Sequence, residues 1–155
     1  MDVDRLFDDW ERAWSGRDVR AFEEVCAPDV HYEDPLTPAP LVGTAALGAH
    51  ARRLWQAFPD ARVNATGARL AEGMFACAPC RILGTHEGRL GRIAATHREI
   101  EVHAVAYAEL KEQRLLRVRV FFDVYGAGMQ LGALPKHGTA GERALLMLRG
   151  FGLRG

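Results

Sequence analysis

The spacing of apolar residues changes once along this sequence, near residue 60, and this change limits the folds open to the chain. Before it, apolar residues recur every three or four positions over residues 3–14, 19–25 and 44–58, which is typical of amphipathic helices. After it, apolar and polar residues alternate, which predicts long strands. Helices followed by a run of strands indicate an α+β fold.

The second half predicts a sheet of four long strands, over residues 61–71, 74–86, 98–110 and 114–125. A shorter strand is expected at 29–34, ahead of a proline-rich loop at 36–43. A long, curved, mostly antiparallel sheet wrapped around N-terminal helices makes a cone, and the mouth of a cone is a natural ligand cavity. We therefore predict this cone-shaped α+β architecture.

The length of the chain, 155 residues, fits a single domain over residues 1–155. Residues 126–132 predict a short turn or helix after the last strand. Residues 139–150 predict a helix within a C-terminal extension at 136–155.

Composition argues against several classes of function. Twenty basic and 20 acidic residues leave a net charge of zero, which argues against a nucleic-acid partner. No apolar run approaches the ~18 residues of a membrane span, and the acidic N-terminus is unlike a secretory signal. Three cysteines fit a reducing compartment, so we expect a cytoplasmic protein in which Cys77 and Cys80 are plain buried thiols.

The sequence His-Tyr-Glu-Asp-Pro, residues 31–35, gathers ionisable groups at the end of a short strand. Pro35 biases Asp34 toward an extended conformation, and strand alternation then places Tyr32 and Asp34 on the same face. We expect both to point into the cavity. The alternative is that Asp34 forms an Asx turn that begins the proline-rich loop.

A second carboxylate, Asp123, lies at the end of the last long strand, on the face that carries Phe121 and Tyr125. A carboxylate in an apolar cavity suits proton transfer, so Asp123 is a candidate general acid or base. The alternative is a strand-end aspartate that caps the following turn.

Histidines supply further candidates. His86 ends one long strand, and His103 lies within the next strand on the Tyr107 face, so each is either a pocket donor or a structural histidine. His50 and His137 are expected at the surface. The histidines show no metal-binding spacing, so no metal site is predicted.

Four large aromatic residues, Trp10, Trp14, Trp55 and Phe58, recur at helical spacing in the first half of the chain. Residues in such a pattern are usually core. In a cone the two interpretations overlap, because the inner face of each helix is also a wall of the cavity.

Several short motifs occur in an order that resembles one known family. They are Ser-Gly-Arg-Asp at 15–18, Ala-Pro-Asp-Val-His-Tyr-Glu-Asp-Pro at 27–35, Phe-Pro-Asp at 58–60, Gly-Thr-His-Glu-Gly at 84–88, Phe-Phe-Asp at 121–123 and Met-Gln-Leu-Gly at 129–132. Over residues 3–135 the chain resembles the nuclear-transport-factor-2-like superfamily, and within it the SnoaL-like polyketide cyclases.

The resemblance implies a set of roles. The cyclases use an aspartate on the last long strand as general acid/base for an intramolecular aldol closure, which falls on Asp123, and the family histidine falls on His86. No metal or organic cofactor is implied. Ketosteroid isomerases, which are more distant relatives, place a proton-shuttling aspartate at Asp34. Their oxyanion donors fall on Trp10 and Ala106, which cannot replace them, so steroid isomerisation is set aside.

Two residues depart from the cyclase pattern. His97 stands where family members usually carry a glycine, and Arg119 where a tryptophan is common. Arg119 either suits a more polar ligand or forms an ion pair with Asp123, which would leave the site inactive.

We therefore expect acid/base proton transfer on a small apolar or aromatic carbonyl compound, such as polyketide-type cyclisation. Asp123 would act as the acid/base, supported by Asp34, His86 and His103. The alternatives are an epoxide hydrolase or dehydratase on the same cone, or a protein that only binds an apolar ligand. A homodimer through the outer face of the sheet is expected. The residues expected to contact the ligand are Trp10, Trp14, Tyr32, Phe58, Tyr107, Arg119, Phe121 and Tyr125.

Overall fold

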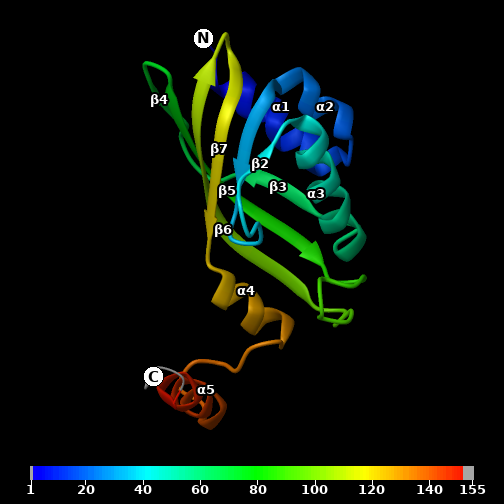
Figure 1. Ribbon diagram of the computed structural model, residues 1–155, viewed down its shortest axis with the longest axis vertical. Coiled ribbons are helices and arrows are strands. Elements are labelled where there is room, and N and C mark those ends of the chain that lie inside the picture. The colour runs from blue at the N-terminus through cyan, green and yellow to red at the C-terminus, as the bar shows by residue number, and fades with distance from the viewer. Residues whose placement is uncertain (1, 152–155) are drawn as a thin grey trace.

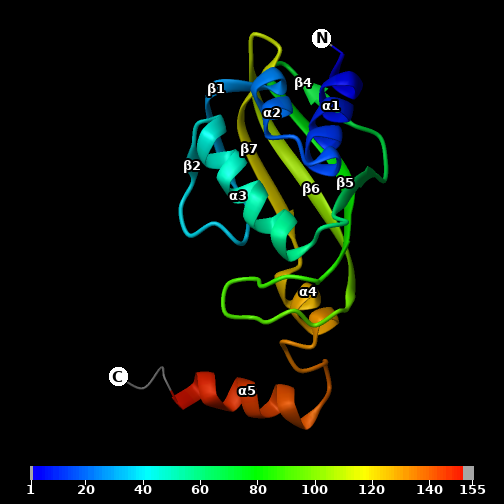
Figure 2. The same ribbon diagram turned by 90° about the vertical axis from the view of Figure 1, so that its right-hand side faces the viewer.

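The computed structural model describes residues 2–151, and in it helices cover one face of a curved, unclosed sheet (Figures 1 and 2). The elements in chain order are α1 (Val3–Gly16), α2 (Val19–Val25), β1 (Cys26–Glu33), β2 (Leu41–Val42), α3 (Thr44–Ala57), β3 (Arg62–Ala65), β4 (Leu70–Glu72), β5 (Phe75–Thr85), β6 (Glu99–Lys111), β7 (Arg114–Phe122), α4 (Val124–Leu131) and α5 (Ala140–Phe151). The predicted α+β fold with a curved sheet is confirmed.

The strands follow the order β2-β1-β7-β6-β5-β3, and β4 pairs with β5 outside this path. The β1–β7 pair is parallel and the other pairs are antiparallel. The parallel pair brings the end of β1 beside β7, so residues from the first quarter of the chain lie next to the last long strand of the sheet. Helices α1, α2 and α3 lie over one face, and α4 and α5 follow β7 beyond one end of the sheet (Figures 1 and 2).

The predicted strands differ from the observed ones mainly at their ends. Residues 61–71 form two short strands, β3 and β4, instead of one long strand. The predicted loop at 36–43 contains β2, which pairs with β1. The last long strand stops at Phe122, because the Asp123 side chain accepts a hydrogen bond from the Gly126 N–H and begins α4.

The inner face of the sheet is built from small residues, which explains why a cavity remains beneath the helices. Ala104, Ala106 and Ala108 of β6 are buried there, and β7 adds Val118 and Val120. Trp10 and Trp14 of α1 and Trp55 of α3 line this cavity together with Ala106 and Val120 of the sheet.

Candidate active site

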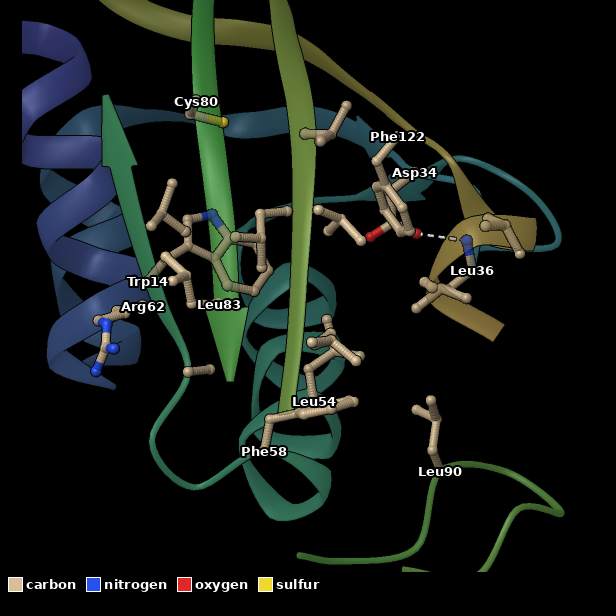
Figure 3. A pocket seen from close by; sticks show the side chains of 18 of the residues that line it. Trp14, Asp34, Leu36, Leu54, Phe58, Arg62, Cys80, Leu83, Leu90 and Phe122 are labelled. Carbon is tan, nitrogen blue, oxygen red and sulfur yellow. Dashed lines mark hydrogen bonds between the residues drawn. The ribbon is translucent and has the colours of Figure 1, made fainter. Parts of the chain in front are cut away.

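A cavity of about 200 Å³ lies between the inner face of the sheet and the helices (Figure 3). Six aromatic residues, several aliphatic ones and Cys80 form its walls, and Asp34 and Arg62 supply the charged side chains of the lining. Figure 3 shows Asp34 and Leu36 at one side of the cavity, and Trp14 and Arg62 at the other. The aromatic residues in the lining are Trp10, Trp14, Tyr32, Trp55, Phe58 and Phe122.

The carboxylate of Asp34 is held by three hydrogen-bond donors. Its Oδ2 accepts from the Tyr32 hydroxyl and from Nε2 of His50, both at 2.8 Å. Its Oδ1 accepts from the backbone N–H of Leu36 at 2.7 Å. The side chains of Asp34 and His50 are almost wholly buried, at 2% and 5% exposed. A fixed, buried carboxylate therefore faces an apolar cavity.

Burial and these hydrogen-bond donors shift the pKa of Asp34 in opposite directions. Burial raises the pKa of the carboxyl group, but the hydrogen bonds from His50, Tyr32 and Leu36 outweigh it and lower the pKa below 3.8. Burial and the neighbouring carboxylate raise the pKa of Tyr32 well above 10. At neutral pH the cavity therefore contains an ionised Asp34 and a protonated Tyr32.

Local sequence fixes the position of Asp34. It directly follows β1, just ahead of Pro35, and its backbone N–H donates to the Thr37 hydroxyl at 3.1 Å. The Leu36 N–H on Oδ1 makes the Asx turn that the sequence offered as an alternative. The turn and the inward orientation occur together, because Oδ1 serves the turn and Oδ2 meets Tyr32 and His50.

His50 was missed, and its predicted surface position is wrong. It lies on α3 and is 4% exposed. The signal was present in the sequence, because His50 is three residues after Leu47 and four before Leu54, on the apolar stripe of the helix. A histidine on such a stripe needs a polar partner inside the protein, and Asp34 is that partner.

The predicted inward orientation of Asp123 is wrong. Asp123 is exposed, caps α4 and does not line the cavity. His103 is likewise exposed, on the outer face of β6. Arg119 pairs with Glu33 rather than with Asp123, so the proposed inactivating ion pair does not form.

The expected ligand contacts divide by face. Of the eight, four lie in the cavity wall: Trp10, Trp14, Tyr32 and Phe58. Tyr107, Arg119 and Phe121 are exposed on the outer face of the sheet, and the Tyr125 hydroxyl donates to the Pro135 carbonyl outside the cavity. The error has one cause: the face of β6 and β7 that carries polar residues was taken as the cavity side, whereas the inner face is the apolar one.

His86 is fully buried, and its ring stacks on Phe58 of the cavity wall with 5.1 Å between ring centres. The Thr96 backbone N–H donates to Nδ1 at 3.3 Å, which makes Nε2 the N–H donor of the ring. That donor has no hydrogen-bond partner among the described residues. His86 thus supports the wall behind Phe58 and does not itself line the cavity.

Cys26 and Cys80 are buried thiols, whereas Cys77, which was also predicted to be buried, is half-buried. Burial raises the pKa of Cys80, in the cavity wall, to about 11 and that of Cys26 to about 12. At neutral pH both are protonated and therefore poor nucleophiles. Among the described residues, no three His, Cys, Asp or Glu side chains lie together as metal ligands would.

Comparison with known proteins places this chain in a family. The family model for the SnoaL-like polyketide cyclase matches residues 4–131. The chain belongs to the SnoaL-like polyketide cyclase family. No functionally curated protein matches the sequence.

Several solved structures share the fold of the chain. TsrD from Streptomyces laurentii is 24% identical, with 85% of this chain and 96% of that chain covered and a TM-score of 0.75. IdmH from Streptomyces antibioticus is 17% identical, with 85% and 99% covered and a TM-score of 0.74. A ketosteroid isomerase-like protein from Catenulispora acidiphila, solved with trimethylamine, is 16% identical, with 82% and 92% covered and a TM-score of 0.72.

The family match ends at residue 131, before the C-terminal helix α5. Among the helices of residues 2–151, none is long and apolar enough to cross a membrane.

Proposed function

We propose that this SnoaL-like protein catalyses proton transfer on an apolar carbonyl compound, with Asp34 as the base, in a reaction of the polyketide-cyclisation type. One observation carries the proposal: Asp34 is an ionised, buried carboxylate fixed by three donors at the wall of an apolar cavity. The proposal differs from the sequence-based hypothesis in its acid/base residue, because Asp34 lines the cavity and Asp123 does not.

The chemistry is an intramolecular aldol closure. Asp34 removes a proton from a carbon next to a carbonyl group, and the resulting enolate attacks a second carbonyl carbon of the same molecule. The new carbon–carbon bond leaves an alkoxide, which takes the proton back from Asp34. No cofactor enters this balance, and a positioned general base contributes roughly 100- to 10,000-fold to such a step.

His50 acts in this scheme as a positioning residue. Its Nε2 N–H holds Oδ2 of Asp34 at 2.8 Å, but His50 does not line the cavity. Tyr32 does line it, and its hydroxyl donates to the same oxygen. The Tyr32 hydroxyl can therefore stabilise the negative charge on this oxygen before Asp34 takes the proton and after Asp34 returns it.

The size and lining of the cavity limit the substrate. An apolar cavity of about 150 Å³ holds a benzene ring, so about 200 Å³ suits one ring with a short chain or two fused rings. Aromatic walls favour a flat molecule, and the mainly apolar lining favours a neutral one. We propose a one- or two-ring carbonyl compound as the substrate.

A second candidate is a dehydratase or epoxide hydrolase on the same site. The hydrogen bond between His50 and Asp34 favours it, because a carboxylate–histidine pair can also accept a proton and transfer it through water. Such an enzyme would expel or add water rather than join two carbons.

The experiment measures hydrogen–deuterium exchange at the α-carbon of β-tetralone, a fused two-ring ketone, by NMR in D₂O. We expect the wild type to accelerate exchange and Asp34→Asn to lose at least about 100-fold of that rate. Binding, followed by quenching of tryptophan fluorescence, should persist in Asp34→Asn, because the walls are unchanged.

Asp123→Asn is the matched control, since asparagine also caps a helix and the same chemical change is made outside the cavity. It should exchange at the wild-type rate. Loss of exchange in Asp123→Asn with retention in Asp34→Asn would restore the strand-end aspartate as the base. Binding without exchange in the wild type would instead indicate a ligand-binding protein. Loss or addition of water, seen by mass spectrometry with hydroxylated or epoxide-bearing bicyclic compounds, would favour the second candidate.

A further inference from the structure

The lining of the cavity meets solvent at a small number of side chains. Among the described residues that line it, Leu36, Val124 and Arg62 are exposed, and the others are buried or half-buried. Leu36 and Val124 are 42% and 41% exposed. An apolar side chain that lines a cavity and also meets solvent lies at the edge of an opening, so these two residues locate a candidate entrance.

Leu36 and Val124 come from distant parts of the chain but lie at the same end of the sheet. β1 and β7 run parallel, with Glu33 opposite Arg119, so the segments that follow the two strands leave the sheet at one end. Leu36 follows β1, and Val124 begins α4 after β7. Figures 1 and 2 show the loop after β1 at the end of the sheet where α4 begins. The opening therefore lies between this loop and α4.

Two aspartates hold the residues at this opening in place. Oδ1 of Asp34 accepts from the Leu36 N–H at 2.7 Å, and Oδ1 of Asp123 accepts from the Gly126 N–H at 2.8 Å. The first bond fixes the backbone of Leu36 beside the carboxylate of Asp34. The second bond fixes the first turn of α4, which begins with Val124. The opening is thus formed before a ligand binds, and Asp34 lies at it.

The opposite side of the cavity, at Trp14, is held together by bonds between elements. The Trp14 carbonyl accepts from Nε1 of Trp55 at 3.0 Å, and the Ser15 hydroxyl accepts from the Val63 N–H at 2.9 Å. These bonds tie the end of α1 to α3 and to β3. Arg62 is exposed on this side, but Figure 3 shows its guanidinium group pointing away from the middle of the cavity, as a solvated charge does.

We propose that the substrate enters between Leu36 and Val124 and binds with its rings toward Trp14 and its acidic carbon at the entrance, beside Asp34. This inference rests on the proposed function, because it takes Asp34 as the base. One or two rings fill a cavity of about 200 Å³, so a chain on the acidic carbon extends past the entrance. The site therefore accepts ring ketones with a chain on the acidic carbon and excludes those with a chain on the far ring. Leu36 and Val124 determine this specificity.

Two propyl derivatives of β-tetralone test the orientation, because they have the same size and polarity. One carries the propyl group on C1, the acidic carbon between the carbonyl group and the aromatic ring, and the other carries it on C6 of the aromatic ring. Binding is followed by quenching of tryptophan fluorescence. We expect the C1 derivative to bind about as tightly as β-tetralone. The C6 derivative should bind at least about 10-fold more weakly, because its propyl group overpacks the closed side.

Two substitutions narrow the entrance and keep the backbone bonds around it. Leu36→Phe and Val124→Phe should each raise the dissociation constant of the C1 derivative, relative to that of β-tetralone, at least about 10-fold. Val42→Phe is the matched control, because Val42 is 58% exposed and does not line the cavity, so this ratio should stay at its wild-type value. A ratio of two ligands on one variant is unaffected by a lower fraction of folded protein.

Tighter binding of the C6 derivative than of the C1 derivative would place the entrance on the Arg62 side and overturn the inference. Equal binding of the two derivatives, or an unchanged ratio in both Leu36→Phe and Val124→Phe, would overturn it as well. Deuterium exchange with the C1 derivative distinguishes this inference from the proposed function. The expected order of binding without exchange would contradict Asp34 as the base alone. Exchange that is lost in Asp34→Asn, together with the reverse order of binding, would contradict the entrance alone.

Discussion

The carboxyl group of Asp34 combines two properties that a polar side chain seldom has together. It is almost fully buried, yet hydrogen bonds from His50, Tyr32 and Leu36 lower its pKa below 3.8 despite the opposing effect of burial. The charge is therefore stabilised mainly by fixed donors instead of by water. This makes Asp34 a source of stability as well as the proposed base.

The effect of Asp34 on stability should depend on pH. Its pKa is lower in the folded chain than the ordinary 3.8, so its contribution is complete above about 3.8 and is lost as pH falls through the folded pKa. We expect Asp34→Asn to lower the free energy of unfolding by about 1–3 kcal/mol at neutral pH. The difference from wild type should shrink below about pH 4.

Urea unfolding at a series of pH values measures this difference. Tyr32→Phe removes one of the three donors and should give a smaller difference that also shrinks in acid. A difference between Asp34→Asn and wild type that stays constant from neutral to strongly acid pH would contradict the assigned role of the donors.

Some of the site could be predicted at the level of single residues. Pro35 and strand alternation were enough to orient Tyr32 and Asp34, because local sterics decide that geometry. The orientation of Asp123 was harder to predict. A strand-end aspartate among aromatic residues has the same sequence pattern whether its side chain faces the cavity or the outer side of the sheet. Only the packing of the helices on the alanine-bearing face of β6 decides between the two.

At the scale of the elements, the turn between β6 and β7 contradicts its own sequence preference. Its two central residues, Glu112 and Gln113, have φ of 51° and 63°, while Lys111 and Arg114 pair on either side. This is a two-residue turn with two left-handed positions, which Asn-Gly fits best. The strands predicted at 98–110 and 114–125 leave room for a short hairpin, but neither Glu112 nor Gln113 is typical of this turn type.

Replacing Glu112–Gln113 by Asn-Gly should therefore stabilise the chain. Left-handed backbone costs ordinary residues roughly 1–2 kcal/mol each, so a net gain of about 1 kcal/mol is expected after the entropy cost of glycine. For a chain of this size that corresponds to a rise of about 2–4 °C in Tm, measured by calorimetry. Gln113→Gly alone should give part of the gain, and a lower Tm in the double variant would contradict the assignment.

At the scale of the whole molecule, the cavity is assembled from distant parts of the chain. α1 and α3 supply the tryptophans, the end of β1 supplies Asp34, the sheet supplies the floor, and the segment between β5 and β6 supplies Leu90 and Ile93. Hydrophobic periodicity predicted the helices and strands that surround the cavity, since it depends on local spacing. It could not predict how closely the β5–β6 segment approaches α3, which depends on a contact between two backbones.

That contact requires Gly88. The N–H groups of Glu87 and Gly88 donate to the Ala57 carbonyl at 2.9 and 3.0 Å, where α3 ends. A Cβ added at Gly88 would lie 1.9 Å from the carbonyl oxygen of Gln56, which is backbone and cannot turn aside. Gly88→Ala should therefore displace the segment that carries Leu90 and open the cavity wall.

We expect Gly88→Ala to lower the free energy of unfolding by more than about 2 kcal/mol, as backbone clashes do, and to weaken binding of β-tetralone as well. Denaturant unfolding and tryptophan-fluorescence titration measure the two effects. Gly16→Ala is the matched control, because a Cβ there meets no atom within 4 Å, and it should change stability by less than about 0.5 kcal/mol. If Gly88→Ala unfolds and binds as Gly16→Ala does, the β5–β6 segment does not depend on this close approach. If it unfolds earlier yet binds normally, the segment stabilises the fold without forming the cavity wall.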